Sequence, residues 1–336
     1  MDTILASTAF DLVTAALPPL IISPYATSSR AFSRIEYKQT LIYWTGFEER
    51  VRQNLKSQTM NPVPLAHCLK TPHSFHLSNE LSCCSDDESI ADRLYNNVGQ
   101  VMEAVFDVQN LDLRVVDFKT YQAMVSPGVK VPDMVIMHSD TSLGLIGEVQ
   151  APWKHYLSVR RLHECELRRC LGPIARDMHT RKCKYGFLST YDETIFLKQG
   201  PHPFRAGEWA LWYSDIIFGN QNSMDIDSTS PADLHGKVSL RECFLYLGNK
   251  IAARQDTAHN PTDVSQWVNR INKSTDCNAA HFSDDPNIPI PWATSVPHEP
   301  YGSAQKQPGQ YEENPYSATQ EQPVAYQESN TYAEAH

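Results

Sequence analysis

The feature that most constrains the fold is a pair of β-rich segments separated by a short polar stretch. Residues 129 to 138 are rich in valine and other apolar side chains, and residues 143 to 149 form a second run of this kind. Residues 139 to 142 between them are Ser, Asp, Thr and Ser, which are typical of a turn. The sequence therefore predicts a β-hairpin that folds about the midpoint of residues 140 and 141.

This hairpin places two carboxylates opposite each other. In that register the numbers of paired residues add up to 281, so Asp133 lies opposite Glu148. Directly opposed residues of an antiparallel pair share one face of the sheet, with Cβ atoms roughly 5 Å apart. Gln150 follows two residues after Glu148 and projects to the same side. The sequence predicts that these three polar groups converge on an otherwise apolar hairpin.

Paired carboxylates at that separation indicate a cation site. They raise each other's pKa unless a cation lies between them. Oxygen ligands with room for water and a substrate phosphate suit Mg²⁺ better than zinc. The residues alone also allow a structural interpretation, in which Asp133 begins a strand after Pro132 and Glu148 faces water, as charged strand residues usually do.

The order of the predicted elements indicates a mixed α/β core. We expect helices over residues 4–16, 46–57, 89–107, 157–182 (broken or restarted at 172–173) and 239–254, and further strands over 112–118, 185–190 and 194–199. A turn is expected at residues 127–128. Helix, strands, helix and strands in succession predict a sheet flanked by helices.

Pro132 and Asp133, followed after fourteen residues by Glu148, Val149 and Gln150, resemble the PD-(D/E)xK pattern. Together with GEVQAPW (147–153) and KYGFLSTYDETIFLKQ (184–199), they resemble a fungal family of PD-(D/E)xK nuclease-like proteins. The likeness spans roughly residues 90 to 250 and is densest over 130 to 200. The resemblance implies a restriction-endonuclease-like core, in which a mixed central β-sheet is flanked by helices.

The resemblance also implies roles for individual residues. Asp133 and Glu148 would bind Mg²⁺, and Gln150 stands where the family has a lysine that orients the attacking water. An acid on the preceding helix often completes the site, and Glu103 is the candidate for it. Gln150 carries no charge and cannot replace an ammonium group. Lys130 and Lys154 are the nearby cations that we consider as substitutes.

The distribution of charge suggests a partner. The net charge is -10, yet residues 154–205 hold eleven Lys or Arg against five Asp or Glu. This basic segment predicts contact with nucleic acid, DNA in particular, although a solvated helix face explains it equally well. Eight cysteines without regular spacing indicate an intracellular protein, nuclear or cytoplasmic rather than secreted, and the apolar N-terminus is not convincing as a signal peptide or a membrane span.

Composition divides the chain into three parts. We expect a partly ordered N-terminal extension at 1–85, the nuclease-like domain at 86–255, and a disordered polar and acidic tail at 256–336. Three functional hypotheses follow. The chain is a Mg²⁺-dependent phosphodiesterase that acts on DNA, an inactive nuclease-fold module that binds nucleic acid or protein, or an interaction scaffold.

Overall fold

The computed structural model describes residues 8–26, 34–63, 65, 83–125, 131–153, 155, 157–160, 163–223 and 237–271, without the side chains of residues 159 and 160. Its centre is a seven-stranded mixed sheet in the order β2-β8-β7-β6-β5-β4-β3. The strands are β2 (Thr40–Tyr43), β3 (Leu113–Asp117), β4 (Met134–His138), β5 (Leu143–Val149), β6 (Tyr185–Ser189), β7 (Glu193–Pro201) and β8 (Trp209–Phe218). Neighbours run antiparallel except for the parallel pairs β5/β6 and β2/β8.

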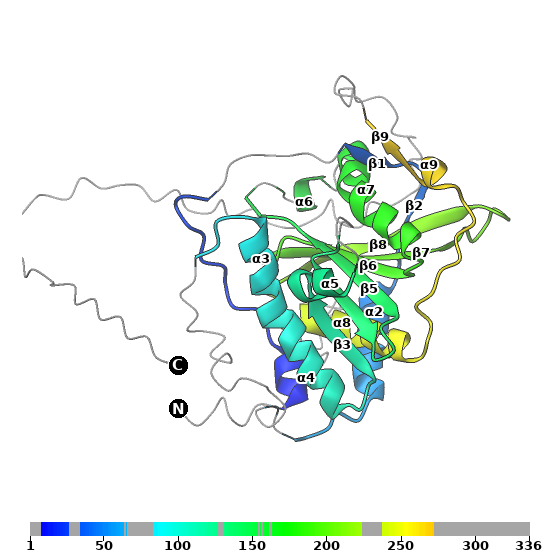
Figure 1. The fold of residues 1–336 in the computed structure, drawn as a ribbon. Coiled ribbons are helices and arrows are strands. Elements are labelled where there is room, and N and C mark those ends of the chain that lie inside the picture. Colours follow the sequence, from blue (N-terminus) through cyan, green and yellow to red (C-terminus); the bar gives the residue numbers. More distant parts are fainter. Residues whose placement is uncertain are drawn as a thin grey trace, which may run out of the picture. The chain divides into compact units, whose positions relative to one another are not determined.

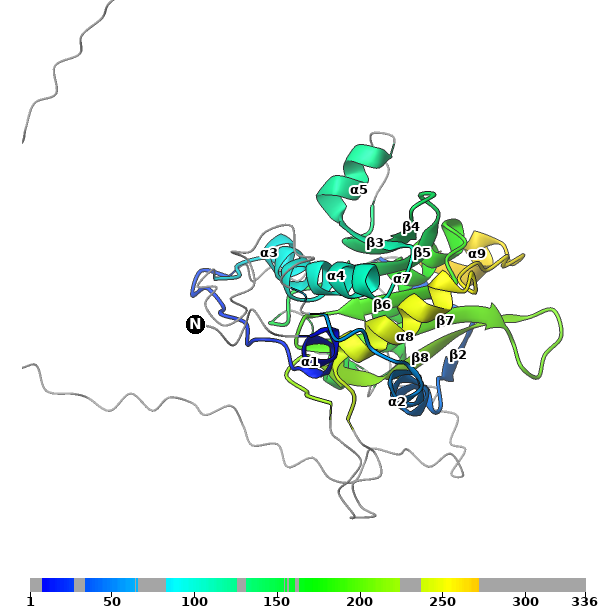
Figure 2. The same cartoon turned by 90° about the horizontal axis from the view of Figure 1, so that it is seen from below.

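Helices lie on both faces of this sheet (Figures 1 and 2). One face is covered by α1 (Ala9–Thr14), α2 (Phe47–Ser57), α3 (Asp87–Leu94), the π-helical turn η3 (Tyr95–Gly99), α4 (Gln100–Val108) and α8 (Leu240–Ala252). The other face is covered mainly by α7 (Glu164–Thr180), and α6 (Leu157–Arg160) precedes it. The small sheet of β1 (Ile35–Tyr37) and β9 (Val268–Arg270) and the helix α9 (Val264–Trp267) pack against α7. Each face has its own apolar core, so every central strand is buried on both sides.

The predicted hairpin is confirmed together with its register. Met134 pairs with Gly147, Val135 with Ile146 and Ile136 with Leu145, and the numbers of each pair add up to 281. The register shifts only near the turn, where Met137 pairs with Leu143. Because three consecutive pairs hold the predicted register, the sequence pattern was sufficient to align the two strands.

Several predicted elements differ from those observed, among them the helix at 157–182, which is divided into α6 and α7 with the non-helical His163 before α7. The break at residues 172–173 is wrong, because α7 continues through Pro173. Gly172 instead permits a close contact, since a Cβ atom at this position would lie 2.2 Å from the carbonyl oxygen of Ile35. The predicted strand at 112–118 ends at Asp117, whose side chain caps α5 (Phe118–Met124), a helix that the pattern did not predict. The predicted turn at 127–128 lies outside the described residues.

The ends of the folded body also differ from the predicted boundaries. Within the supposed N-terminal extension, β2 is an edge strand of the main sheet and β1 pairs with β9. Residues 256–271, assigned to the tail, are part of the same body: Asp256 is buried against His138, and the buried Trp267 donates a 2.9 Å hydrogen bond to the Ala175 carbonyl. The rest of the predicted tail, 272–336, lies outside the described residues. Among the helices that the structure does describe, none combines the length and the apolar composition of a membrane span.

Candidate metal site at the end of strand β5

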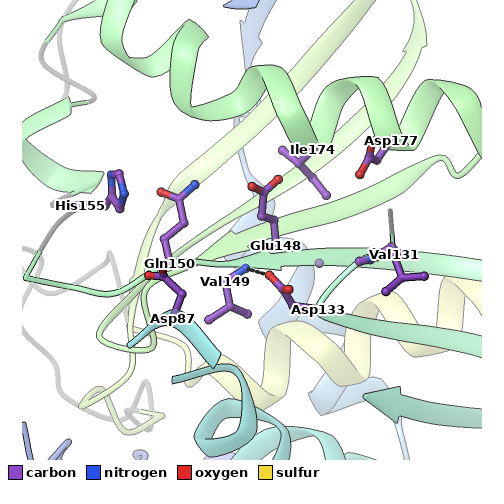
Figure 3. Close-up of a pocket in the computed structure, with 11 residues that line it drawn as sticks. Asp87, Val131, Asp133, Glu148, Val149, Gln150, His155, Ile174 and Asp177 are labelled. Carbon is purple, nitrogen blue, oxygen red and sulfur yellow. Dashed lines mark hydrogen bonds between the residues drawn. The ribbon is translucent and has the colours of Figure 1, made fainter. Parts of the chain in front are cut away.

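A cavity of about 250 Å³ opens where β5 ends, beneath α7. All three polar residues predicted to converge, Asp133, Glu148 and Gln150, line it (Figure 3). The walls are completed by residues from α3, from the segment before β4 and from α7. The structure thus brings the predicted residues to one cavity.

Asp133 is fixed by the backbone of the neighbouring strand. It lies just before β4, and its N–H donates a 3.0 Å hydrogen bond to the Gly147 carbonyl. Its carboxylate oxygen Oδ2 accepts the Val149 N–H at 2.7 Å (Figure 3). This contact orients the Asp133 carboxylate, which as a group can accept about four hydrogen bonds. The half-buried side chain is therefore held at the cavity wall by β5.

Glu148 projects from β5 towards α7 (Figure 3). Ile146, two residues earlier on the strand, belongs to the apolar core beneath α7, whereas Val149 belongs to the opposite core. Val135, two residues after Asp133, is also in the α7 core. Because side chains alternate along a strand, both carboxylates belong to the α7 face, as the register predicted.

Gln150 continues this line of side chains beyond the end of β5. Its backbone N–H donates a 2.9 Å hydrogen bond to the Ser189 carbonyl of the parallel neighbour β6. Its side-chain Oε1 atom is buried and has no hydrogen-bond partner among the described residues. A buried amide oxygen without a donor loses roughly 1–3 kcal/mol. A cation or a water molecule in the cavity would recover this free energy.

Two further acids line the cavity, and the sequence pattern did not point to them. Asp87 is the first residue of α3, and its Oδ1 accepts a 2.7 Å hydrogen bond from the N–H of Ala151, the residue that follows Gln150. Asp177 descends from α7 and forms a 3.1 Å ion pair with Arg176. The buried His155 lies on the Gln150 side (Figure 3). The only available signal was the acidic run at 86–88, which also has a simpler role in helix capping.

Glu103 is not part of this cavity. It lies on α4, and its carboxylate is 3.2 Å from the guanidinium of Arg114 on β3, which is separated from β5 by β4. The expectation that an acid precedes the hairpin on a helix is better matched by Asp87. Lys130 and Lys154, considered as substitutes for the missing lysine, lie outside the described residues. Along the described part of the lining there is no Lys or Arg.

Among the described residues, the cations of the basic segment 154–205 lie on both faces of the sheet. On α7, Arg168 pairs with Glu164 at 2.6 Å and also donates to the carbonyls of Tyr37 and Gln39. Lys198 of β7 lies over two tryptophan rings that belong to the opposite core. Its charges are thus divided between the two faces of the sheet.

An oxygen-rich donor set fits Mg²⁺ better than a transition metal. Mg²⁺ is commonly bound by one or two carboxylates and completes its shell with water and phosphate oxygens. Among the described side chains, no group of three or more His, Cys, Asp or Glu converges closely enough to form a complete metal centre. Asp133, Glu148 and the amide oxygen of Gln150 are oxygen donors, which Mg²⁺ prefers, whereas a structural zinc site uses thiolate and imidazole ligands.

Comparison with protein families, with characterised proteins and with solved structures finds no match to this chain. Any functional conclusion must therefore be argued from the site itself.

Proposed function

We propose that the chain is a PD-(D/E)xK nuclease-like protein that hydrolyses phosphodiester bonds of DNA with the help of Mg²⁺. The observation that carries the proposal is the arrival of Asp133, Glu148 and Gln150 at one cavity through the β4/β5 pairing. The order of elements around it supports the same core: a helix (α3 to α4), three antiparallel strands (β3 to β5), a helix (α7) and a strand parallel to β5 (β6).

Each residue has a defined task in this proposal. Asp133 and Glu148 would hold the ion, and Asp133 is oriented for this by its hydrogen bond from Val149. When bound, Mg²⁺ would polarise the scissile phosphate and stabilise the charge that develops on it. The Gln150 amide would hold the attacking water by a hydrogen bond, but it provides neither a positive charge nor an acidic proton.

The absence of the motif lysine predicts a slow enzyme. Loss of a single group that stabilises the transition state commonly lowers kcat about 10²- to 10³-fold. We therefore expect Gln150→Lys to accelerate cleavage, because the ammonium group would restore positive charge beside Glu148. This substitution also removes the buried amide oxygen that has no hydrogen-bond donor among the described residues.

The test is cleavage of supercoiled plasmid by the purified full chain in Mg²⁺ or Mn²⁺, with EDTA as a blank. Asp133→Asn and Glu148→Gln should each abolish cleavage and weaken Mn²⁺ binding measured by calorimetry. Glu208→Gln is the matched control, since the Glu208 side chain lies at the surface, where it pairs with Arg205. Cleavage that persists in Asp133→Asn would reject this assignment of the site.

A second function, binding of nucleic acid without cleavage, takes account of one observation that disfavours catalysis. The described lining of the cavity contains four acids and no Lys or Arg to stabilise a transition state. In this case the wild-type chain and Gln150→Lys would both bind DNA with no turnover. A gel-shift assay run beside the plasmid assay separates the two functions.

A further inference from the structure

A second cavity lies on the opposite face of the sheet. It has a volume of about 320 Å³ and is bounded by α2, β6, β7, β8 and α8. Tyr185 and Trp44 in its wall belong to the core beneath α8, on the other side from Glu148. Leu145 and Tyr185 pair at one end of the parallel strands β5 and β6, and Val149 and Ser189 pair at the other. Four residue steps correspond to about 13 Å along a strand, so this cavity does not adjoin the acidic one.

Four cationic side chains line this second cavity, and each comes from a different element. They are Arg50 of α2, Lys184 just before β6, Lys198 of β7 and Lys250 of α8. The described lining contains no Asp or Glu. None of the four makes an ion pair with any residue that the structure describes. Such a concentration of unbalanced positive charge attracts anions.

The acid that acts electrostatically on Tyr185 is engaged elsewhere. Asp256 lies close enough to influence Tyr185, but its carboxylate forms a buried 3.0 Å contact with His138. It therefore does not neutralise the lysines of the cavity.

Aromatic rings hold the lysines in place. The Lys198 ammonium lies 4.9 Å from the ring centroid of Trp44 and 4.5 Å from that of Trp212. Lys184 lies over Tyr185 at 5.6 Å, and Lys250 lies over Tyr246 at 5.7 Å. Cation–π contacts of this kind contribute about 0.5–2 kcal/mol each and reduce the freedom of the flexible lysine side chains. The three lysines are thus preorganised before any ligand binds.

The state of Lys198 supports this description. Burial, together with the neighbouring positive charges of Arg50 and Lys184, lowers its pKa to about 8. Along the described lining the titratable groups besides Lys198 are Arg50, Lys184, Tyr185, Tyr246 and Lys250, so no lining side chain supplies a negative charge there. An anion bound here would remove this penalty.

We propose that this cavity binds a small organic molecule that carries two or more phosphate groups. Four positive charges match a multiply charged anion better than a single carboxylate, and Arg and Lys are the usual phosphate partners. The half-buried Trp212 ring offers an apolar surface for the organic part. A volume of about 320 Å³ lies at the lower end of the range for small-molecule sites.

The test measures binding of pyrophosphate and of ADP to the full chain by calorimetry in EDTA, at pH 7 and fixed ionic strength. We expect ADP to bind at least as tightly as pyrophosphate, and Lys198→Gln to weaken both at least tenfold. Lys250→Gln should weaken the binding of both ligands as well, and it provides a second test if Lys198→Gln does not fold. Lys119→Gln, a surface lysine paired with Glu88 and Asp92, is the control of equal charge.

Three results would overturn the proposal. The first is that neither ligand binds, and the second is that both lysine variants bind them as the wild type does. The third is that duplex DNA binds in EDTA in a manner that depends on Lys198, while ADP and pyrophosphate do not bind. This result would make the surface a nucleic-acid contact. Because the assay contains no metal, Asp133→Asn should leave ADP binding unchanged, so this proposal fails or succeeds independently of the nuclease proposal.

Discussion

Asp133 has a structural role and a proposed functional role, and two substitutions separate them. Its carboxylate accepts the Val149 N–H at 2.7 Å, and Val149 is 5% exposed. Asp133→Ala leaves that buried N–H without its acceptor, which costs about 1–3 kcal/mol. Asp133→Asn retains an acceptor oxygen of the same reach, so most of the hydrogen bond should survive.

The loss of negative charge in Asp133→Asn should stabilise the fold, in contrast to the loss of the hydrogen bond in Asp133→Ala. Asp133, Glu148, Asp87 and Asp177 line the same cavity, and removal of one negative charge relieves repulsion when no cation is bound. In EDTA we therefore expect the Asn variant to be within about 1 kcal/mol of the wild type and the Ala variant about 2 kcal/mol less stable. In contrast, both variants should lose Mg²⁺ affinity.

Urea denaturation in EDTA measures the free energy of unfolding, and an unchanged m-value shows that the two variants are compared on the same transition. Calorimetric titration with Mg²⁺ measures the second role. Equal destabilisation by Asn and Ala would refute the structural argument. Wild-type Mg²⁺ affinity in Asp133→Asn would refute the functional one.

Three further predictions concern other parts of the fold. Gly172→Ala should lower the free energy of unfolding by about 1–3 kcal/mol despite the better helix propensity of alanine, because its Cβ would lie 2.2 Å from the Ile35 carbonyl oxygen; thermal unfolding checks the sign. Arg241→Leu should cost about 3 kcal/mol or more in urea denaturation, since the buried guanidinium donates to the carbonyls of Asn97, Leu12 and Ala15; stability equal to wild type would contradict this. Lys198 has a folded pKa of about 8, below its ordinary value, so its contribution to stability should increase as pH rises from about 8 to about 10.5. The difference in free energy of unfolding between wild type and Lys198→Met, measured by denaturation across that range, should therefore shift in favour of the wild type. A difference that does not vary with pH would show that the pKa of the lysine is unperturbed.

The strands around the candidate metal site were the most predictable part of the fold. Strand β5 was predicted with its observed bounds, because its apolar run ends in the polar residues of a turn and of the site. The register followed from symmetry about the turn. Local sequence patterns are informative here because the two strands are adjacent along the chain.

Elements that depend on distant contacts were not predictable in this way. β2 is a strand because it pairs with β8, about 170 residues later, and β1 is a strand because it pairs with β9. Asp87 reaches the cavity through a hydrogen bond to Ala151, which no local pattern encodes. Arg241 was equally hidden, since a buried arginine on a helix is indistinguishable in sequence from an exposed one.

The opposite charges of the two cavities determine which of them can bind a phosphate group without a metal ion. The acidic cavity repels phosphate by itself, because its described lining holds acids and no Lys or Arg. A phosphodiester can therefore approach Asp133 and Glu148 only if a cation lies between them, and binding at that cavity must depend on the metal. The basic cavity needs no such ion, since Lys184, Lys198 and Lys250 supply the positive charge directly. Affinity for a phosphate-bearing ligand that survives EDTA should thus arise on the α8 face of the sheet, and affinity that requires Mg²⁺ should arise beneath α7.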